Sequence, residues 1–74
     1  MGGPMLTEIV ENLTRREKDL VRAIARGLTN RQIASEFGIS EQTVKNHLTV
    51  VFHKLHVRTR LELAVHAIRH SLNR

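Results

Sequence analysis

Seventy-four residues make one small domain, and a chain of this length buries only about 60% of its unfolded surface, so its core must be simple. The absence of cysteine excludes disulfides and thiolate metal sites, and no apolar run approaches the roughly 20 residues of a membrane span. Twelve Lys and Arg stand against seven Asp and Glu, and the resulting net charge of +5 favours a polyanionic partner.

The distribution of the positive charge along the chain is more informative than the net charge. Between Gln42 and Arg60 there is no carboxylate, whereas the cations of this stretch include Lys45, Lys54 and Arg58. Only two aromatic residues are present, both Phe, so the chain lacks a stacking surface for unpaired bases. The amino terminus has no signal-peptide profile. These features indicate a soluble, cytoplasmic protein that binds duplex DNA and no membrane.

The amino-terminal residues precede the clear helical pattern. Residues 1–5 place Gly-Gly-Pro before a second Met, which is typical of a vector-derived leader, with a natural flexible terminus as the alternative. Residues 6–13 are predicted to be a linker or a short helix, because apolar side chains recur at helical spacing at Leu6, Ile9, Val10 and Leu13. The domain itself is expected over residues 14–74.

Thr14 begins the first clear helix, with Glu17 in the capping-box position three residues later. The helix is expected to end before Gly27. Its apolar stripe is predicted to be Leu20, Val21, Ile24 and Ala25. The remaining face mixes both signs of charge, and we interpret this helix as scaffold.

The next stretch has the pattern of a helix-turn-helix. Thr29 and Gln32 form a second capping pair, and the helix that they start is expected to run to about Phe37. Gly38 tolerates the left-handed conformation that lets the chain reverse. Two short crossing helices would touch through Ile33, Ala34, Phe37, Ile39, Val44 and Leu48. An unrelated helical hairpin is the alternative.

Ser40 is positioned to cap a third helix over about residues 41–55. At about 100° per residue, its apolar side chains fall on one inner face that consists of Val44, Leu48, Val51 and Leu55. The opposite, outer face carries Gln42, Asn46, Thr49, Val50 and His53, with Lys45 at its edge. We expect the inner face to pack in the core and the outer face to read DNA.

Base contacts are expected on this outer face. Lys45 can donate to guanine O6 and N7, and Asn46 can pair with adenine N6 and N7. Thr49 and Val50 can offer methyl groups to thymine. Any one of these residues alone would be interpreted as an ordinary exposed helix residue. Their combination on the second helix of a helix-turn-helix favours base readout, for which we select Gln42, Lys45, Asn46 and Thr49.

Phosphate contacts are expected beside the outer face and at the start of the preceding helix. Free backbone N–H groups at a helix amino terminus hold phosphates, which favours Thr29 and Asn30, although capping alone would also explain both. Contacts along the flanks of the third helix would set register without reading sequence, and the residues there are Thr43, His47, Lys54 and Arg58. For His47, packing is the alternative.

Thr59 begins the last helix, with Glu62 as its capping partner. The core stripe of this helix is predicted to be Leu61, Val65, Ile68 and Leu72. A second, partly apolar face lies nearly opposite and consists of Leu63 and Ala67, flanked by His66 and His70. We interpret this second face as a dimer contact, with scattered exposed apolar residues as the alternative. The expected fold is all-α, a compact four-helix bundle that contains a helix-turn-helix.

Six motifs follow one another along the chain: Leu13-Thr14-Arg15-Arg16-Glu17, Gly27-Leu28-Thr29-Asn30, Ile33-Ala34, Ile39-Ser40, Thr43-Val44-Lys45-Asn46-His47 and Lys54-Leu55. Over nearly all of residues 13–70 they resemble the LuxR/NarL-type, or GerE-type, DNA-binding domain. The resemblance implies a four-helix bundle whose third helix enters the major groove and whose fourth helix mediates dimerisation. It also implies the carboxy-terminal effector domain of a bacterial response regulator in a two-component system, with one of the family's short stand-alone members as the alternative.

The resemblance extends to individual site residues. Lys45 and Asn46 fall on positions that contact bases in this family, and Gln42 and Thr49 on more variable ones. Lys54 and Thr43 match positions that contact the DNA backbone. Two residues depart from the family pattern. His56 stands where glycine is common, which leaves the end of the third helix open by a residue or two, and Val50 stands where many members have asparagine.

Other functions have less support in the sequence. A Zn or Ni site could use Glu62, His66 and His70, which are spaced four residues apart, but ligands from one helix rarely close a coordination shell alone. We therefore expect no metal, no cofactor and no catalytic residue. The closer alternative is a module like region four of sigma factors that docks on RNA polymerase. Our prediction is transcription regulation by a homodimer, weak in isolation, on an inverted repeat, with a contact to RNA polymerase left open.

Overall fold

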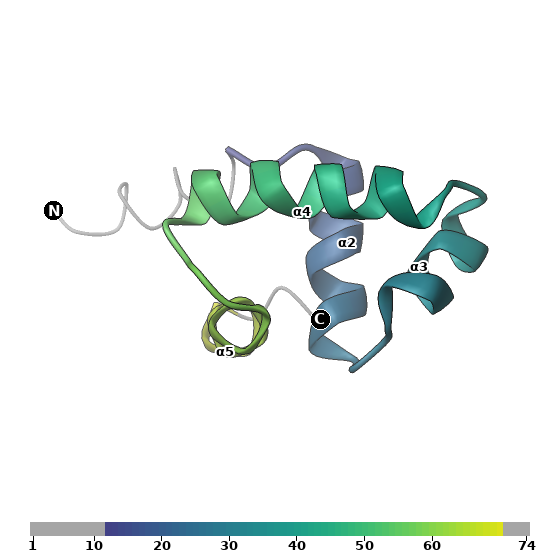
Figure 1. Ribbon diagram of the computed structural model, residues 1–74. Coiled ribbons are helices and arrows are strands. Elements are labelled where there is room, and N and C mark those ends of the chain that lie inside the picture. The colour runs from purple at the N-terminus through teal and green to yellow at the C-terminus, as the bar shows by residue number, and fades with distance from the viewer. Residues whose placement is uncertain (1–11, 71–74) are drawn as a thin grey trace, which may run out of the picture.

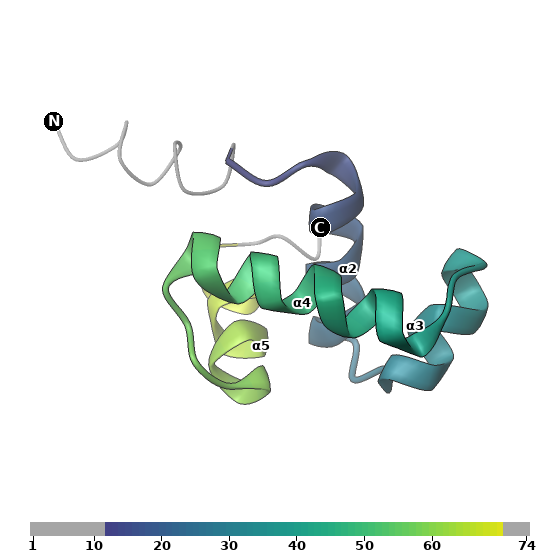
Figure 2. The same ribbon diagram turned by 45° about the horizontal axis from the view of Figure 1, so that its top comes forward.

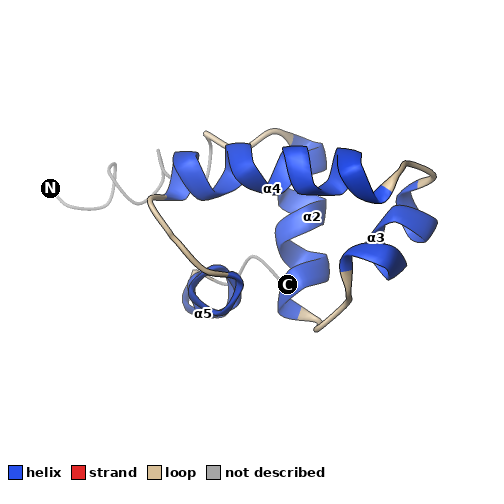
Figure 3. Cartoon of the chain, viewed as in Figure 1, coloured by secondary structure: helices blue, strands red, loops and turns tan. Residues whose placement is uncertain are grey.

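A computed structural model describes residues 12–70 of the chain. Within this range it has no strand, and its helices are α2 (Arg15–Ala25), α3 (Asn30–Phe37), α4 (Glu41–Leu55) and α5 (Arg60–Arg69) (Figure 3). The all-α prediction is therefore confirmed. Most of the segment 6–13 and Leu72 lie outside the described residues, but Asn12 and Leu13 are not helical. None of the helices described is long and apolar enough to cross a membrane.

The helices are arranged around α2. It packs against both α4 and α5, and α3 packs against α4 to form the helix-turn-helix pair. In Figure 1, α4 extends across the molecule with α2 behind and below it, α3 beyond one side of α2, and α5 seen end-on at the other. Figure 2 shows the same arrangement with α4 in front of the other helices. The side of α4 that faces away from α2 is thus left uncovered by the described helices.

Each helix begins where the sequence places a hydroxyl cap. The side-chain oxygens of Thr14, Thr29, Ser40 and Thr59 accept hydrogen bonds from backbone N–H groups in the first turn of their helices. The backbone N–H groups of the first two caps also donate to Glu17 and Gln32, at 2.8 Å in both cases. The predicted capping boxes at α2 and α3 are confirmed. At α5 only the hydrogen bond to the Thr59 side chain is present, because the Glu62 carboxylate accepts from the backbone N–H of Arg58 and not from that of Thr59.

Two of these helices end at a residue in the left-handed backbone conformation. Gly38 ends α3 at φ +69°, as predicted. His56 ends α4 at φ +56°, which fixes the helix end that the sequence left open. His56 is the only described residue other than glycine with a positive φ, a conformation that crowds a Cβ atom.

The core is assembled from one apolar face of each helix. Every member is at most 6% exposed, and the set comprises Leu13, Leu20, Val21, Ala23, Ile24, Ile33, Ala34, Val44, Leu48, Val51, Leu55, Leu63 and Ala67. Among the described residues no polar or charged residue is buried. The predicted inner face of α4 is confirmed in full. In α2 the buried alanine is Ala23, and the predicted Ala25 is only half-buried.

The prediction for the two faces of α5 is wrong. Leu63 and Ala67, predicted to be exposed dimer contacts, are 0% exposed and belong to the core. Three residues predicted to be core are exposed instead: Leu61 (75%), Val65 (41%) and Ile68 (59%). The helix is apolar on both sides, and α2 contacts it on the side that carries the smaller Ala67, where two backbones can approach closely.

Replacing His56 by Gly should stabilise the domain. Glycine adopts the left-handed conformation without crowding a Cβ atom, so we expect the free energy of unfolding to rise by about 0.5–1 kcal/mol in urea titrations. His53→Gly is the matched control, because His53 is an exposed residue inside the same helix. That change should destabilise by about 1 kcal/mol. A loss of stability in His56→Gly would contradict this account.

Candidate nucleic-acid interface

The outer face of α4 is one continuous exposed surface. The side chains opposite the buried stripe are exposed, and we call them the reading face: Gln42, Lys45, Asn46, Thr49, Val50 and His53. Within the described residues, Lys45 makes no ion pair, so its ammonium group is available to a partner. The separation of α4 into a packed inner face and an exposed outer face is confirmed.

Two hydrogen bonds connect members of the reading face along the helix. The Gln42 side-chain amide donates to Asn46 Oδ1 at 3.1 Å, which links the two groups one helical turn apart. The hydroxyl of Thr49 donates to the backbone carbonyl of Lys45 at 3.0 Å. Asn46 therefore keeps both amide hydrogens for a partner, and Thr49 has its hydroxyl hydrogen engaged within the helix.

The residues predicted at the start of α3 are largely engaged within the domain. Thr29 caps the helix, and Asn30 Oδ1 accepts a hydrogen bond of 2.6 Å from the guanidinium of Arg60. The same guanidinium donates to the carbonyl of Leu28 at 2.5 Å. Arg60 thereby fastens the first turn of α5 to the loop between α2 and α3. Arg31, exposed in the first turn of α3, is a nearby cation that the sequence analysis did not single out.

Lys54 is also occupied by contacts within the domain. Its Nζ atom lies 2.8 Å from Glu17 Oε1 and 3.2 Å from the carbonyl oxygen of Asn12. The side chains of the ion pair are 28% and 13% exposed for Lys54 and Glu17. Burial raises the pKa of Glu17, but the hydrogen bonds from Lys54 and Thr14 and the Lys54 charge outweigh it, so the pKa lies below its usual 4.5. Lys54 thus joins the end of α4 to the start of α2.

The other flanking residues are more accessible to a partner. Arg58 is exposed just after α4, and within residues 12–70 only its backbone N–H is bonded, to Glu62 Oε2 at 3.3 Å. The Thr43 hydroxyl lies 2.9 Å from that of Ser40, and His47 is half-buried. Of the six predicted phosphate contacts, Arg58 therefore offers the most accessible charge.

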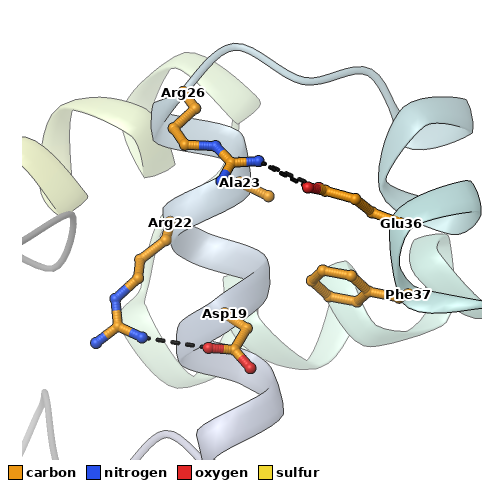
Figure 4. A pocket seen from close by; sticks show the side chains of 6 residues that line it. All are labelled: Asp19, Arg22, Ala23, Arg26, Glu36 and Phe37. Carbon is orange, nitrogen blue, oxygen red and sulfur yellow. Dashed lines mark hydrogen bonds and ion pairs between the residues drawn. The ribbon is translucent and has the colours of Figure 1, made fainter.

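A shallow cleft of about 260 Å³ lies between α2 and α3 (Figure 4). Asp19 and Arg22 pair across 3.2 Å on α2, and Arg26 reaches Glu36 on α3 at 3.1 Å, as the dashed lines show. Phe37 points toward α2 in this view, and the Arg16 guanidinium stacks on its ring at 4.4 Å from the centroid. The charges are paired and partly solvated, and we interpret the cleft as scaffold surface.

The histidines of α5 form a pair rather than a metal cluster. The rings of His66 and His70 lie 4.2 Å apart, and both residues are half-buried. Burial, and then the neighbouring His70, lower the pKa of His66 below its usual 6.5. Over residues 12–70, no three His, Cys, Asp or Glu side chains gather in a way that could hold a metal ion.

A comparison of the chain with known protein families decides its class. The family described as "Bacterial regulatory proteins, luxR family" matches residues 11–67, which include all of α2, α3 and α4 and most of α5. The chain belongs to the luxR family. This family consists of DNA-binding transcription regulators and is not a class of enzymes. The family that the sequence motifs indicated is thereby confirmed.

Individual relatives of this luxR-family domain are bacterial regulators. The chain is 46% identical over 61 residues to the uncharacterized transcriptional regulatory protein YhcZ of Bacillus subtilis, covering 82% of this chain and 28% of that protein. It is 49% identical over 53 residues to the nitrate/nitrite response regulator protein NarP of Escherichia coli, covering 72% of this chain and 25% of that protein. For the response regulator protein VraR of Staphylococcus aureus the identity is 38% over 65 residues, covering 88% of this chain and 31% of that protein. The chain thus spans about a quarter to a third of these relatives.

The Glu17 ion pair should make the stability of the domain depend on pH. Because the folded-state pKa of Glu17 is depressed, its contribution is present above pH 4.5 and is lost as the pH falls through the folded-state pKa. Glu17→Gln should therefore cost about 1–2 kcal/mol in urea unfolding at neutral pH. The difference between wild type and variant should shrink steadily below pH 4.5.

Glu36→Gln is the matched control, since it removes one carboxylate from the more exposed pair with Arg26. We expect it to cost no more than about 0.5 kcal/mol. If Glu17→Gln and wild type differed by the same amount at neutral and acid pH, the ion pair would not have the stabilising role assigned to it.

Proposed function

We propose that this domain binds duplex DNA in a sequence-specific manner, with α4 in the major groove. The observation that carries the proposal is the reading face, which is exposed, mostly polar and free of carboxylates on the second helix of a helix-turn-helix. A helix in this position can enter the major groove with its exposed side chains against the base edges. The buried side chains of α4, such as Val44 and Val51 at 0% exposure, hold the helix in place.

The side chains of the reading face suit the base edges of the major groove. Lys45 donates to the O6 and N7 acceptors of guanine, and the Asn46 amide pairs with adenine. Gln42 is joined to Asn46 by their hydrogen bond, so the two amides act as a unit. Thr49 completes the set that we propose for base readout.

Phosphate contacts would hold the helix in register. We assign them to Thr29, Asn30, Thr43, His47, Lys54 and Arg58, in the loops and flanks around α4. Arg58 needs no rearrangement, because its side chain is exposed. To reach a phosphate, Lys54 would have to give up its ion pair with Glu17. Asn30 would have to contact the phosphate beside its hydrogen bond with Arg60. Arg31 is a further candidate at the start of α3.

We also propose that the domain binds DNA as a homodimer through α5. The exposed residues Leu61, Val65 and Ile68 form an apolar stripe, which we call the α5 stripe and which replaces the predicted contacts at Leu63 and Ala67. A second copy would cover this stripe about a two-fold axis, and the two α4 helices would enter successive major grooves of an inverted repeat. His66 and His70 would lie at the edge of this contact. Dimerisation of the isolated domain would be weak.

The biological role that we propose is transcription regulation, by a domain that serves as the effector of a response regulator. The relatives named above, which include response regulators, support this role. An autonomous DNA-binding domain should shift an operator fragment without RNA polymerase. A module like region four of sigma factors would require the polymerase, so this assay separates the two functions.

Selection from a random duplex library should enrich an inverted repeat, and Lys45→Ala should relax the preference at one position of each half-site. We expect the change to cost about 1–3 kcal/mol on the best site in anisotropy titrations. Arg58→Ala is the contrasting variant, because it removes an exposed cation outside the reading face. It should weaken all sequences alike and reduce the slope of log affinity against log salt by about 0.9. Unchanged preference in Lys45→Ala would contradict the assigned reading face.

Disruption of the α5 stripe should abolish the dimer and leave the fold intact. Ile68→Glu places a charge on a side chain that is 59% exposed, so the core is not affected. In sedimentation experiments the variant should remain monomeric at concentrations at which wild type associates, and binding to an inverted repeat should lose its cooperativity. Ser35→Glu, on the exposed face of α3, adds the same charge and should behave as wild type. Equal association of all three proteins would rule out the α5 stripe as the dimer contact.

A further inference from the structure

Val50 is an exposed apolar residue without a role in the fold. Its side chain is 45% exposed, whereas its neighbour Val51 is 0% exposed and belongs to the core. The other large apolar residues that are exposed in the described range all lie on α5, so Val50 is separate from the α5 stripe. A branched side chain at this position lowers helix propensity slightly and gains little from burial.

The neighbours of Val50 place it in one row of the reading face. Gln42, Asn46 and Val50 are spaced four residues apart and therefore follow one another along one side of α4. The first two are joined by the hydrogen bond between their amides. The row thus presents two linked amides followed by the two methyl groups of Val50. A partner in contact with the whole row must offer hydrogen-bonding groups at one end and an apolar group at the other.

Duplex DNA offers this combination where adenine and thymine are close together. Thymine carries a C5-methyl group in the major groove that the other three bases lack, and apolar side chains contact it. Side chains four residues apart on a helix are separated by about 5–6 Å, and base pairs rise by about 3.4 Å. Val50 would therefore reach a base within about two steps of the one that Asn46 contacts.

We propose that Val50 determines specificity by packing against the C5-methyl group of one thymine in each half-site. The inference rests on the proposed entry of α4 into the major groove, and it adds a residue and a base to that function. Thr49 does not substitute for Val50, because Thr49 belongs to the other row of the face with Lys45, to whose carbonyl its hydroxyl is bonded.

The test uses the operator selected from the random library, with deoxyuridine in place of each thymine in turn. This change removes one methyl group and leaves the hydrogen-bonding edge of the base unaltered. Burial of a methyl group is worth about fourfold in affinity. The affinity of wild type should therefore fall about fourfold when deoxyuridine replaces one particular thymine of each half-site, and change little at the other thymines. Val50→Ala should bind the thymine and uracil operators at that position equally. Val50→Ile should retain the discrimination.

Ser35→Ala is the matched control, since it shortens an exposed side chain on α3, outside the reading face. It should retain the fourfold preference for thymine at the same position. A uracil penalty that is absent at every thymine, or that persists in Val50→Ala, would overturn this inference while leaving the proposed function in place. Failure to enrich any operator, by contrast, would overturn the proposed function itself. Thermal unfolding of Val50→Ala should match wild type closely, because the side chain is outside the core.

Discussion

The contact between the inner face of α4 and the rest of the core is the constraint on which the other features depend. A domain of this size has one small apolar core, and α4 supplies Val44, Leu48, Val51 and Leu55 to it. With these side chains buried, rotation of α4 about its axis would expose apolar surface and bury polar groups. The fold therefore fixes which side chains face outward, and apart from Val50 these are the polar ones that suit a DNA groove.

Long-range polar contacts supplement this small core at the ends of the helices. The pair of Lys54 and Glu17 joins the last turn of α4 to the first turn of α2, and Arg60 fastens α5 to the loop before α3. Both contacts use residues from the cation-rich stretch that the sequence associates with DNA. The same cations thus have two competing uses, and Lys54 can contact a phosphate only by giving up part of its contact with Glu17.

The sequence predicted the features that local chemistry determines and missed those that depend on distant contacts. The caps of α2 and α3, the turn at Gly38 and the two faces of α4 follow from residue types a few positions apart. The orientation of α5 does not follow from local residue types, because both of its faces are apolar. Its packing on α2 makes Leu63, and not Leu61, a core residue. The partners of Lys54 and Arg60 lie 30 or more residues away and leave no local pattern.

The most direct test of the account is a map of backbone amide shifts in the domain as it is titrated with its selected duplex. The central claim is that the outer face of α4 reads DNA. It predicts the largest shifts in α4 between Gln42 and His53, with smaller ones around Arg31 and Arg58. Largest shifts in the cleft between α2 and α3, with α4 unaffected, would contradict it.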